Sequence, residues 1–235
     1  MVYRFACISA SNVSTARRQS TSTRACELIS DLLLTQDATH HVDIISLGDY
    51  DLNPCCMDGN CFVTGECERD PAFNRVYDCL KKADGIFLVC PHYAPFPSKL
   101  MMLLEKLEEI AYLNSSANPE YVFPLSGKPV GLIAHGGQGD HAVPYYQQAL
   151  LEPLTNAFGS LRMPVVSAGG EWPTGVAFGV ESINSQTDSV FVQVNHDWTS
   201  IRTRLMPLVT AVISAVVGTD HHPISQPGSS AGRSG

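Results

Sequence analysis

Charged residues are scarce in this chain of 235 residues. Asp, Glu, Lys and Arg together make up 16% of it, against roughly 25% in a typical soluble protein. The 15 basic residues form no cluster and are outnumbered by 23 acidic ones, which gives a net charge of −8. These features disfavour nucleic acid and anionic membrane surfaces as partners. The low charge also favours a protein with much of its surface covered, for example by further subunits.

Long hydrophobic runs are missing as well. The longest apolar stretch, residues 208–217, is about half the ~20 residues that a membrane span needs. The first residues, MVYRFACISA, lack the basic start and apolar centre of a signal peptide. We therefore expect no membrane association and a cytoplasmic location. In that reducing compartment the eight cysteines are not expected to form disulfides.

Short apolar runs alternate with helical patterns along the chain. Continuous apolar runs of this length are typical of strands buried on both faces of a parallel sheet. They cover residues 2–9, 42–47, 85–90, 129–134 and 163–168, and residues 189–194 are a candidate sixth strand. Helices are predicted at residues 22–34, 73–82, 98–113, 144–161 and 199–217, with Asp70 and Pro71 starting the second. The alternation predicts right-handed crossovers and an α/β fold with an open, doubly wound sheet.

Three segments do not follow this alternation. Residues 49–70 are polar and rich in cysteine, and residues 169–188 are rich in glycine; we expect both to be long functional loops. Residues 219–235 are rich in Pro, Ser and Gly and are expected to be disordered. Residues 1–218 should then form a single domain. Within the helix predicted at 98–113, the charged residues around Lys106 are expected to face solvent.

A ligand site is expected at the carboxyl ends of the strands, near a reversal of strand order. The loop after the first strand is rich in Ser and Thr, holds Arg17 and Arg18, and leads into a helix. Hydroxyls, free backbone N–H groups and a helix N-terminus together suit a phosphate group. The same composition also suits a loop that only caps the helix, and both interpretations stay open. No GxGxxG motif and no Walker lysine occur, which disfavours a dinucleotide or nucleoside-triphosphate site of the usual kind.

Two more loops converge on this edge of the sheet. Residues 91–98 hold three prolines with Tyr93 and Phe96, and such a stiff aromatic loop suits a planar ring, unless both aromatics pack in the core. Residues 135–140 hold three glycines in four positions, which lets backbone N–H groups approach a ligand, although a plain turn has the same composition. The coincidence of three such loops favours a binding site.

Four segments in this order resemble the flavodoxin-like NAD(P)H-dependent FMN reductases, most closely their iron–sulfur flavoprotein branch. They are residues 9–23, residues 53–67 (NPCCMDGNCFVTGEC), residues 85–100 and residues 129–139, and the similarity covers residues 2–168. The resemblance implies a five-stranded parallel sheet of order 2-1-3-4-5 and a homodimer or homotetramer. It also implies bound FMN.

The resemblance assigns a part of FMN to each loop. The first loop holds the phosphate in that family, the second lies along the isoalloxazine ring, and the third hydrogen-bonds the pyrimidine end. The implied FMN contacts are Ser9, Ser11, Arg18, Ser20, Thr21 and Ser22; Pro91, His92, Tyr93, Ala94, Pro95 and Phe96; and His135, Gly136, Gly137, Gln138 and Gly139. The first loop is longer than the family's usual one, so whether Arg17 or Arg18 faces the phosphate stays open.

The implied reaction passes electrons from reduced nicotinamide, NADH or NADPH, through FMN to a quinone, iron or protein acceptor. Because the cofactor carries this chemistry, no side chain is predicted to be catalytic. Two alternatives stay open. One is an electron carrier reduced by ferredoxin, without nicotinamide activity. The other is a scaffold that binds no flavin.

The cysteine-rich segment has three interpretations. The iron–sulfur branch carries C-x2-C-x2-C-x(4–7)-C around a 4Fe–4S cluster, and thiolates suit such clusters. Cys55, Cys61 and Cys67 match three of the ligand positions, and Asp58 stands at the remaining one. Either a cluster forms with Asp58 or Cys56 as fourth ligand, or the segment is a loop without a cluster, or it binds zinc. Adjacent cysteines cannot easily share one tetrahedral ion, which disfavours zinc.

Overall fold

Five parallel strands form one sheet in the order β2-β1-β3-β4-β5 in the computed structural model, which describes residues 2–16, 19–184 and 193–220. The strands are Arg4–Ser9 (β1), His41–Ser46 (β2), Gly85–Pro91 (β3), Val130–His135 (β4) and Val176–Phe178 (β5). All seven residues of β3 and all six of β4 are buried, as expected for a sheet covered on both faces. The predicted flavodoxin-like α/β fold and its strand order are confirmed.

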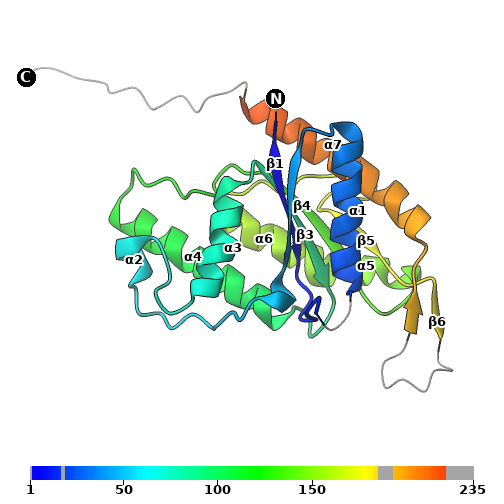
Figure 1. Cartoon of the computed structure of the whole chain (residues 1–235), viewed down its shortest axis with the longest axis horizontal. Coiled ribbons are helices and arrows are strands. Elements are labelled where there is room, and N and C mark those ends of the chain that lie inside the picture. Colours follow the sequence, from blue (N-terminus) through cyan, green and yellow to red (C-terminus); the bar gives the residue numbers. More distant parts are fainter. Residues whose placement is uncertain (1, 17–18, 185–192, 221–235) are drawn as a thin grey trace, which may run out of the picture.

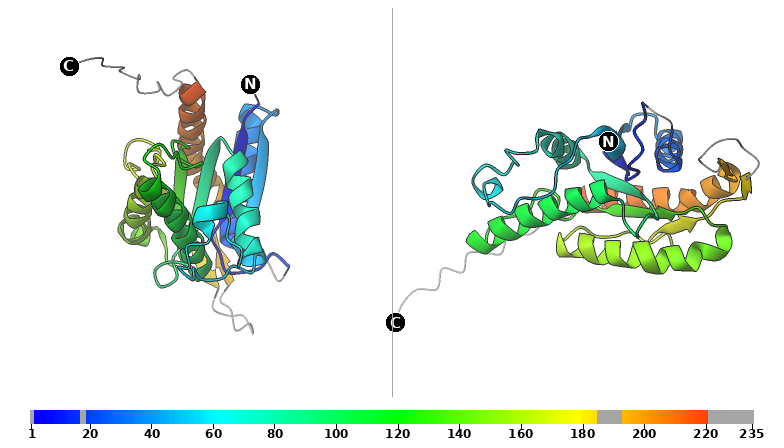
Figure 2. Two further views of the ribbon diagram at one scale, coloured as in Figure 1. Left: turned by 90° about the vertical axis from the view of Figure 1, so that its left-hand side faces the viewer. Right: turned by 90° about the horizontal axis from the view of Figure 1, so that it is seen from below.

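Helices cover both faces of the sheet (Figures 1 and 2). α1 (Thr21–Gln36) and α7 (Trp198–Asp220) pack on one face. The opposite face carries α3 (Pro71–Lys82), α4 (Ser98–Ala117) and α6 (Glu152–Ser160). Asp70 caps α3 as predicted, because its Oδ1 accepts a hydrogen bond from Phe73 N at 2.9 Å and Pro71 follows it.

The helix predicted at 144–161 is divided. It consists of α5 (Val143–Tyr146), a π-helical turn at Gln147–Leu151, and α6. Pro153 near the start of α6 has no N–H for an i→i−4 hydrogen bond, which accounts for the irregular turn before it. The segment expected as one loop, 49–70, also contains a short helix, α2 (Cys61–Thr64), and 3₁₀ turns lie at Leu47–Asp49 and Asp140–Ala142.

One strand prediction is wrong. Residues 163–168 contribute only an isolated bridge between Val130 and Val165, and the fifth strand is Val176–Phe178, within the segment expected to be a loop. The backbone there lies close to β4, since a Cβ on Gly175 would be 2.3 Å from Leu132 O. The same segment forms β6 (Ser182–Asn184), which pairs antiparallel with β7 (Gln193–Asn195). Most of the candidate strand 189–194 lies outside the described residues.

The last helix, Trp198–Asp220, is longer than the predicted 199–217. Trp198–Gly218 is long and apolar enough to span a membrane by length and composition, contrary to our expectation for the chain. However, Leu205, Leu208, Val209 and Val212 are buried in the hydrophobic core on one face of the sheet. α7 therefore occupies the position of a core helix of the α/β fold, and the cytoplasmic location stays a prediction. The expected disordered tail lies outside the described residues apart from its first two, which belong to α7.

Candidate functional site

A cavity of ≈ 880 Å³ opens at the carboxyl ends of β1, β3 and β4, where the three predicted loops meet. Its size lies within the ~300–1,000 Å³ usual for small-molecule sites. It is lined by no Asp or Glu among the described residues, and its one charged lining residue is Arg24. For a chain with net charge −8 this is a marked local reversal, and it favours an anionic ligand.

Most of the predicted contacts line this cavity, but not all. Those that do are Ser11, Ser20, Thr21, Ser22, Pro91, His92, Tyr93, His135, Gly136 and Gly137. Those that do not are Ser9, Ala94, Pro95, Phe96, Gln138 and Gly139. Arg18, like Arg17, lies outside the described residues. The assignment of parts of FMN to these residues stays a prediction.

The start of α1 presents hydroxyls and backbone N–H groups to the cavity. Ser20 is the N-cap, and its Oγ accepts a hydrogen bond from Thr23 N at 3.1 Å. The N–H groups of Thr21 and Ser22, which precede Thr23, have no acceptor within the helix, and no acidic residue stands in the first turn. Ser9 is fully buried behind this turn, with its Oγ 3.0 Å from Thr23 Oγ1, so it supports the loop from within. This helix N-terminus is well suited to a phosphate group.

The loop after β3 contributes one exposed aromatic ring. Tyr93 is 43% exposed, and its Oη lies 3.2 Å from Ser11 Oγ, which joins this loop to the one after β1. His92 Nε2 lies 3.0 Å from Tyr145 Oη. Phe96, expected beside the ring of FMN, does not line the cavity; its side chain is partly buried and packs against the hydrophobic core.

In the glycine-rich loop after β4, the backbone at Gly136 lies close to the side chain of Tyr146. A Cβ on Gly136 would lie 2.3 Å from Tyr146 Oη, and that hydroxyl accepts a hydrogen bond from Gln138 N at 3.0 Å. Gln138 O in turn accepts from Val180 N at 2.8 Å. The backbone of Gln138 is thus engaged with Tyr146 and the end of β5, which explains why it does not line the cavity.

Alanine substitutions at the two neighbouring glycines should separate folding from binding. Gly136→Ala is expected to cost about 1–3 kcal/mol in the free energy of unfolding, because its methyl group would overlap Tyr146. Gly137→Ala meets nothing within 4 Å, so stability should be unchanged. Its methyl group lines the cavity, so flavin affinity should fall. Urea unfolding of both variants measures their stability, and flavin titration measures their affinity. Equal losses of stability would contradict a packing role for Gly136 and an open position for Gly137.

His135 lies buried at the end of β4, beside the first turn of α1. Its Nε2 is 2.8 Å from Ser22 Oγ, and its ring stacks on Phe178 with centroids 5.2 Å apart. Burial, with a smaller contribution from nearby His196, lowers the pKa of His135 to about 3. The ring is therefore neutral at physiological pH and fixes Ser22 without adding charge.

The sequence predictions missed one wall of the cavity. It is formed by Val180, Val194, Asn195, His196 and Trp198; the lining also includes Val13 and Gln19 within the first loop and Arg24 just after it. The Arg24 guanidinium lies 4.3 Å from the centroid of a Trp198 ring, a cation–π contact that joins α1 to the start of α7. No local pattern links residues that far apart in the sequence, so only the tertiary fold reveals this wall.

The cysteine-rich segment forms a separate, small pocket. Cys55, Asp58, Cys61 and Cys67 line a cavity of ≈ 20 Å³, about the room that one water molecule needs. The Asp58 carboxylate is paired with Arg69 at 2.9 Å. Over the described part of the chain, no three His, Cys, Asp or Glu side chains are placed to hold a metal ion together. A single zinc ion does not fit this arrangement, and the 4Fe–4S cluster stays a prediction.

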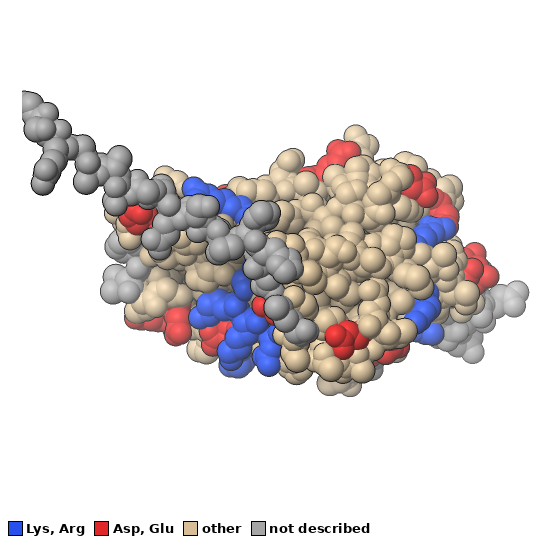
Figure 3. All heavy atoms as spheres, turned by 90° about the horizontal axis from the view of Figure 1, so that it is seen from above, with Lys and Arg blue, Asp and Glu red and all other residues tan. Residues whose placement is uncertain are grey.

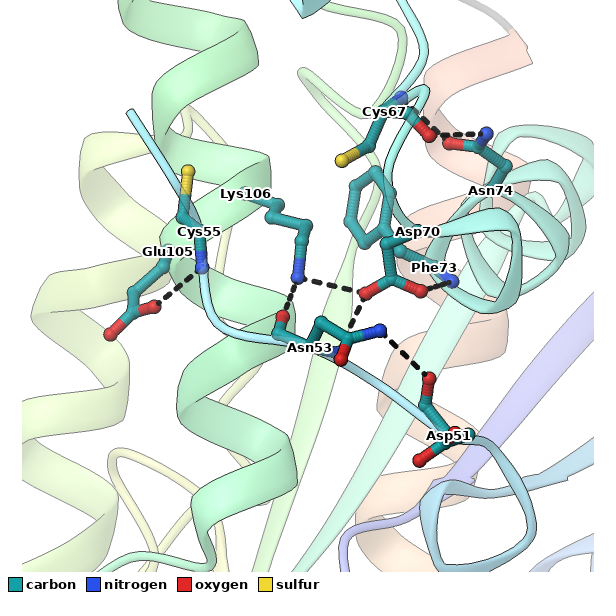
Figure 4. A network of polar contacts seen from close by, with 9 residues as sticks. All are labelled: Asp51, Asn53, Cys55, Cys67, Asp70, Phe73, Asn74, Glu105 and Lys106. Atoms are coloured by element: carbon teal, nitrogen blue, oxygen red, sulfur yellow. Dashed lines mark hydrogen bonds and ion pairs between the residues drawn. The ribbon is translucent and has the colours of Figure 1, made fainter. Parts of the chain in front are cut away.

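A buried ion pair anchors this segment to the helices beside it (Figure 4). Lys106 and Asp70 are 3% and 1% exposed, with Nζ 2.9 Å from Oδ2. Asp70 also accepts hydrogen bonds from Asn53 N and Phe73 N, and Lys106 donates to Asn53 O. Burial alone would raise the pKa of Asp70, but these hydrogen bonds and the Lys106 charge bring it below its usual value. The expectation that Lys106 faces solvent is wrong.

Comparisons with known proteins agree with the fold. The family model described as NADPH-dependent FMN reductase matches residues 7–172. The crystal structure of RosB with bound 8-demethyl-8-formylriboflavin-5'-phosphate has a TM-score of 0.61 at 13% identity, over 94% of this chain and 82% of that one. An NADH:FMN oxidoreductase (EMOB) in its apo form has a TM-score of 0.53 at 19% identity, over 92% and 90%.

An oxidoreductase from Corynebacterium diphtheriae has a TM-score of 0.54 at 17% identity, over 92% of this chain and 98% of that one. At these identities the structural likenesses show the fold alone. No curated protein sequence matches this chain.

Proposed function

This chain belongs to the NADPH-dependent FMN reductase family and is an NAD(P)H-dependent flavin oxidoreductase, and we propose that its FMN occupies the cavity at the carboxyl ends of β1, β3 and β4. The observation that carries this placement is the cavity itself. It combines a helix N-terminus rich in hydroxyls, a glycine-rich loop and an exposed aromatic ring, and no carboxylate lines it among the described residues.

Each wall of the cavity would hold one part of FMN. Ser20, Thr21 and Ser22, with the free N–H groups of the first turn of α1, would hold the phosphate. Tyr93 would flank the isoalloxazine ring, and the N–H groups around Gly137 would face its polar edge. Bound FMN supplies the hydride and electron chemistry, while these residues bind and orient it.

The acceptor that best suits the opening of the cavity is a small planar molecule such as a quinone. Tyr93, which lines the cavity, is 43% exposed, and Tyr145, 51% exposed, is hydrogen-bonded to the lining residue His92. Exposed aromatic faces of this kind favour stacking with a planar ring. The cysteine-rich segment lines a pocket separate from this cavity, and we propose no electron path through it.

Anaerobic mixing with NADPH or NADH tests this function. Rapid bleaching of the FMN absorbance, followed by reoxidation on adding a quinone, is the expected result. Bleaching by reduced ferredoxin but by neither nicotinamide would support the electron-carrier alternative. A protein that stays colourless after incubation with FMN would support the scaffold alternative.

Serine substitutions at Cys55, Cys61 and Cys67 are expected to leave FMN content and NAD(P)H oxidation close to those of the wild type. The reason is that these thiols line a pocket separate from the cavity and are not arranged around a common ion. Iron and acid-labile sulfide should be substoichiometric in anaerobically purified wild-type protein. Close to four irons and four sulfides per chain, lost in the triple variant, would instead establish the cluster.

We also propose that the protein is a homodimer or homotetramer. Figure 3 shows a broad area without Lys, Arg, Asp or Glu side chains on the face it views. On α4, Met101 and Tyr112 are 40% and 67% exposed, and Val122 beyond its end is 66% exposed. Light scattering during gel filtration should give a multiple of 25.4 kDa, and a mass equal to one chain would contradict this proposal.

A further inference from the structure

His196 connects the first turn of α1 to the end of β5. Its Nδ1 lies 3.1 Å from Gly179 O, and its Nε2 lies 3.2 Å from Thr21 Oγ1. A carbonyl oxygen can only accept a hydrogen bond, so Nδ1 carries the hydrogen. In the neutral ring Nε2 must then be the acceptor, and the Thr21 hydroxyl donates to it. This places the lone pairs of Thr21 Oγ1, rather than its hydrogen, toward other partners.

That arrangement is unfavourable for an anion at the start of α1. Thr21 lines the cavity next to the N-cap residue Ser20. A phosphate dianion accepts hydrogen bonds and would be repelled by hydroxyl lone pairs. If the His196 ring gains a proton, both of its nitrogens become donors. Thr21 Oγ1 then accepts from His196 and is free to donate to the phosphate.

We propose that His196 is a positioning residue that takes up a proton when a phosphate monoester binds at the start of α1, and so converts Thr21 into a hydrogen-bond donor to that phosphate. This inference rests on the proposed FMN binding and deepens it. His196 lies C-terminal to residues 7–172, so the part of the chain beyond the family match completes the phosphate site.

The charges around His196 agree with this role. Burial lowers the pKa of His196 below its usual value, the hydrogen bond to Gly179 opposes this, and the Arg24 charge lowers the pKa further. The ring is therefore neutral in the free protein. His135 on β4 is neutral too, Phe178 and Trp198 contribute only rings, and the exposed Asp197 carboxylate caps α7 through Thr199 N and Ser200 N.

A bound phosphate dianion would reverse the electrostatic effects that keep the His196 ring neutral. Arg24 forms no ion pair among the described residues and is held against Trp198, so its charge is available to the same phosphate. Neutralisation of Arg24 by the ligand removes the repulsion it exerts on the His196 ring. The two negative charges of the phosphate then raise the pKa of His196, and the proton comes from the solvent.

Isothermal titration calorimetry with FMN at about pH 7.5, in buffers of different ionisation enthalpy, tests this inference. At that pH a phosphate monoester is almost fully dianionic, since its second pKa is about 6. Wild-type protein is expected to take up between zero and one proton per FMN, measurably above zero. Its FMN affinity should rise as the pH falls from about 8 to 7, by at most about tenfold per unit, the limit for one proton.

Two variants and one ligand serve as controls. Riboflavin, which lacks the phosphate, should bind without proton uptake. His196→Gln and Thr21→Val should each abolish the uptake with FMN and weaken FMN binding, while riboflavin binding shows that each variant is folded. FMN binding without proton uptake in the wild type, or uptake that persists in His196→Gln, would overturn the inference while leaving the proposed function intact. Failure of both flavins to bind the wild type would overturn the proposed function and the inference together.

Discussion

Replacement of Lys106 by Met is expected to lower the free energy of unfolding by about 3–5 kcal/mol, as is usual when one partner of a buried ion pair is removed. The variant leaves the Asp70 carboxylate, 1% exposed, without its counter-charge. Hydrogen bonds from Asn53 N and Phe73 N remain, but they do not neutralise the charge. Urea unfolding followed by circular dichroism measures the change.

The exposed pair on α3 is the matched control. Lys81 and Asp78 are 2.7 Å apart but 32% and 48% exposed, so Lys81→Met should change stability by less than about 1 kcal/mol. A double variant, Lys106→Met with Asp70→Leu, should recover part of the loss because it leaves no buried charge. Equal losses in Lys106→Met and Lys81→Met would contradict the assignment of a buried, stabilising pair.

The ion pair also predicts an acid dependence. The pKa of Asp70 is lower in the folded protein than in the unfolded chain, where it is about 3.9. The contribution of Asp70 to the free energy of unfolding is thus complete above its pKa in the unfolded chain. It is lost as the pH falls through its pKa in the folded protein. The hydrogen bonds from Asn53 N and Phe73 N lower this pKa, and so does Lys106, whose share Lys106→Met removes. The stabilities of wild type and variant should therefore converge as the pH falls below about 4.

Combined replacement of Ser20 and Ser22 by Ala is expected to weaken FMN binding by tenfold or more for each hydroxyl, because a hydrogen bond to a charged group contributes about 1.5–3 kcal/mol. Both residues line the cavity at the start of α1, and the Ser22 hydroxyl is positioned there by His135 Nε2 at 2.8 Å. Equilibrium titration with FMN and with riboflavin measures the effect. Only FMN carries the phosphate, so riboflavin affinity should change little.

Ser14→Ala is the control for this experiment. Ser14 belongs to the same loop, but its Oγ donates to Asp49 Oδ1 at 2.6 Å and does not line the cavity. FMN affinity in this variant should match the wild type. If the Ser20 and Ser22 double variant loses FMN and riboflavin affinity equally, the two hydroxyls shape the fold rather than hold a phosphate.

The fold followed from the sequence where secondary structure has a strong local signal. β3 and β4 appear as buried apolar runs, and α3 begins at a capping Asp followed by Pro. β5 could not be identified in this way, because it has three residues and its approach to β4 depends on Gly175, which resembles any other glycine of a loop. Residues 163–168 have the composition of a strand but pair at one bridge only.

The sequence predicted the side of the site that is built from three continuous loops, but not the opposite wall. The loops after β1, β3 and β4 are rich in Ser, Pro and Gly respectively, and this local composition predicts ligand-binding loops. The strand order brings the three loops together. His196 and Trp198 reach the same cavity through tertiary packing against α1, which leaves no sequence pattern. The burial of Lys106 could not be predicted for a similar reason. The segment that covers its side chain is distant in sequence and irregular.

Titration of FMN with the protein, followed by flavin fluorescence, tests whether the cavity at the carboxyl ends of β1, β3 and β4 binds FMN. Binding is expected to alter the fluorescence and to saturate at one FMN per chain, and Gly137→Ala should weaken this binding without loss of folding. Fluorescence that stays unchanged at protein concentrations far above that of FMN, with the protein folded by circular dichroism, would contradict FMN binding at this cavity.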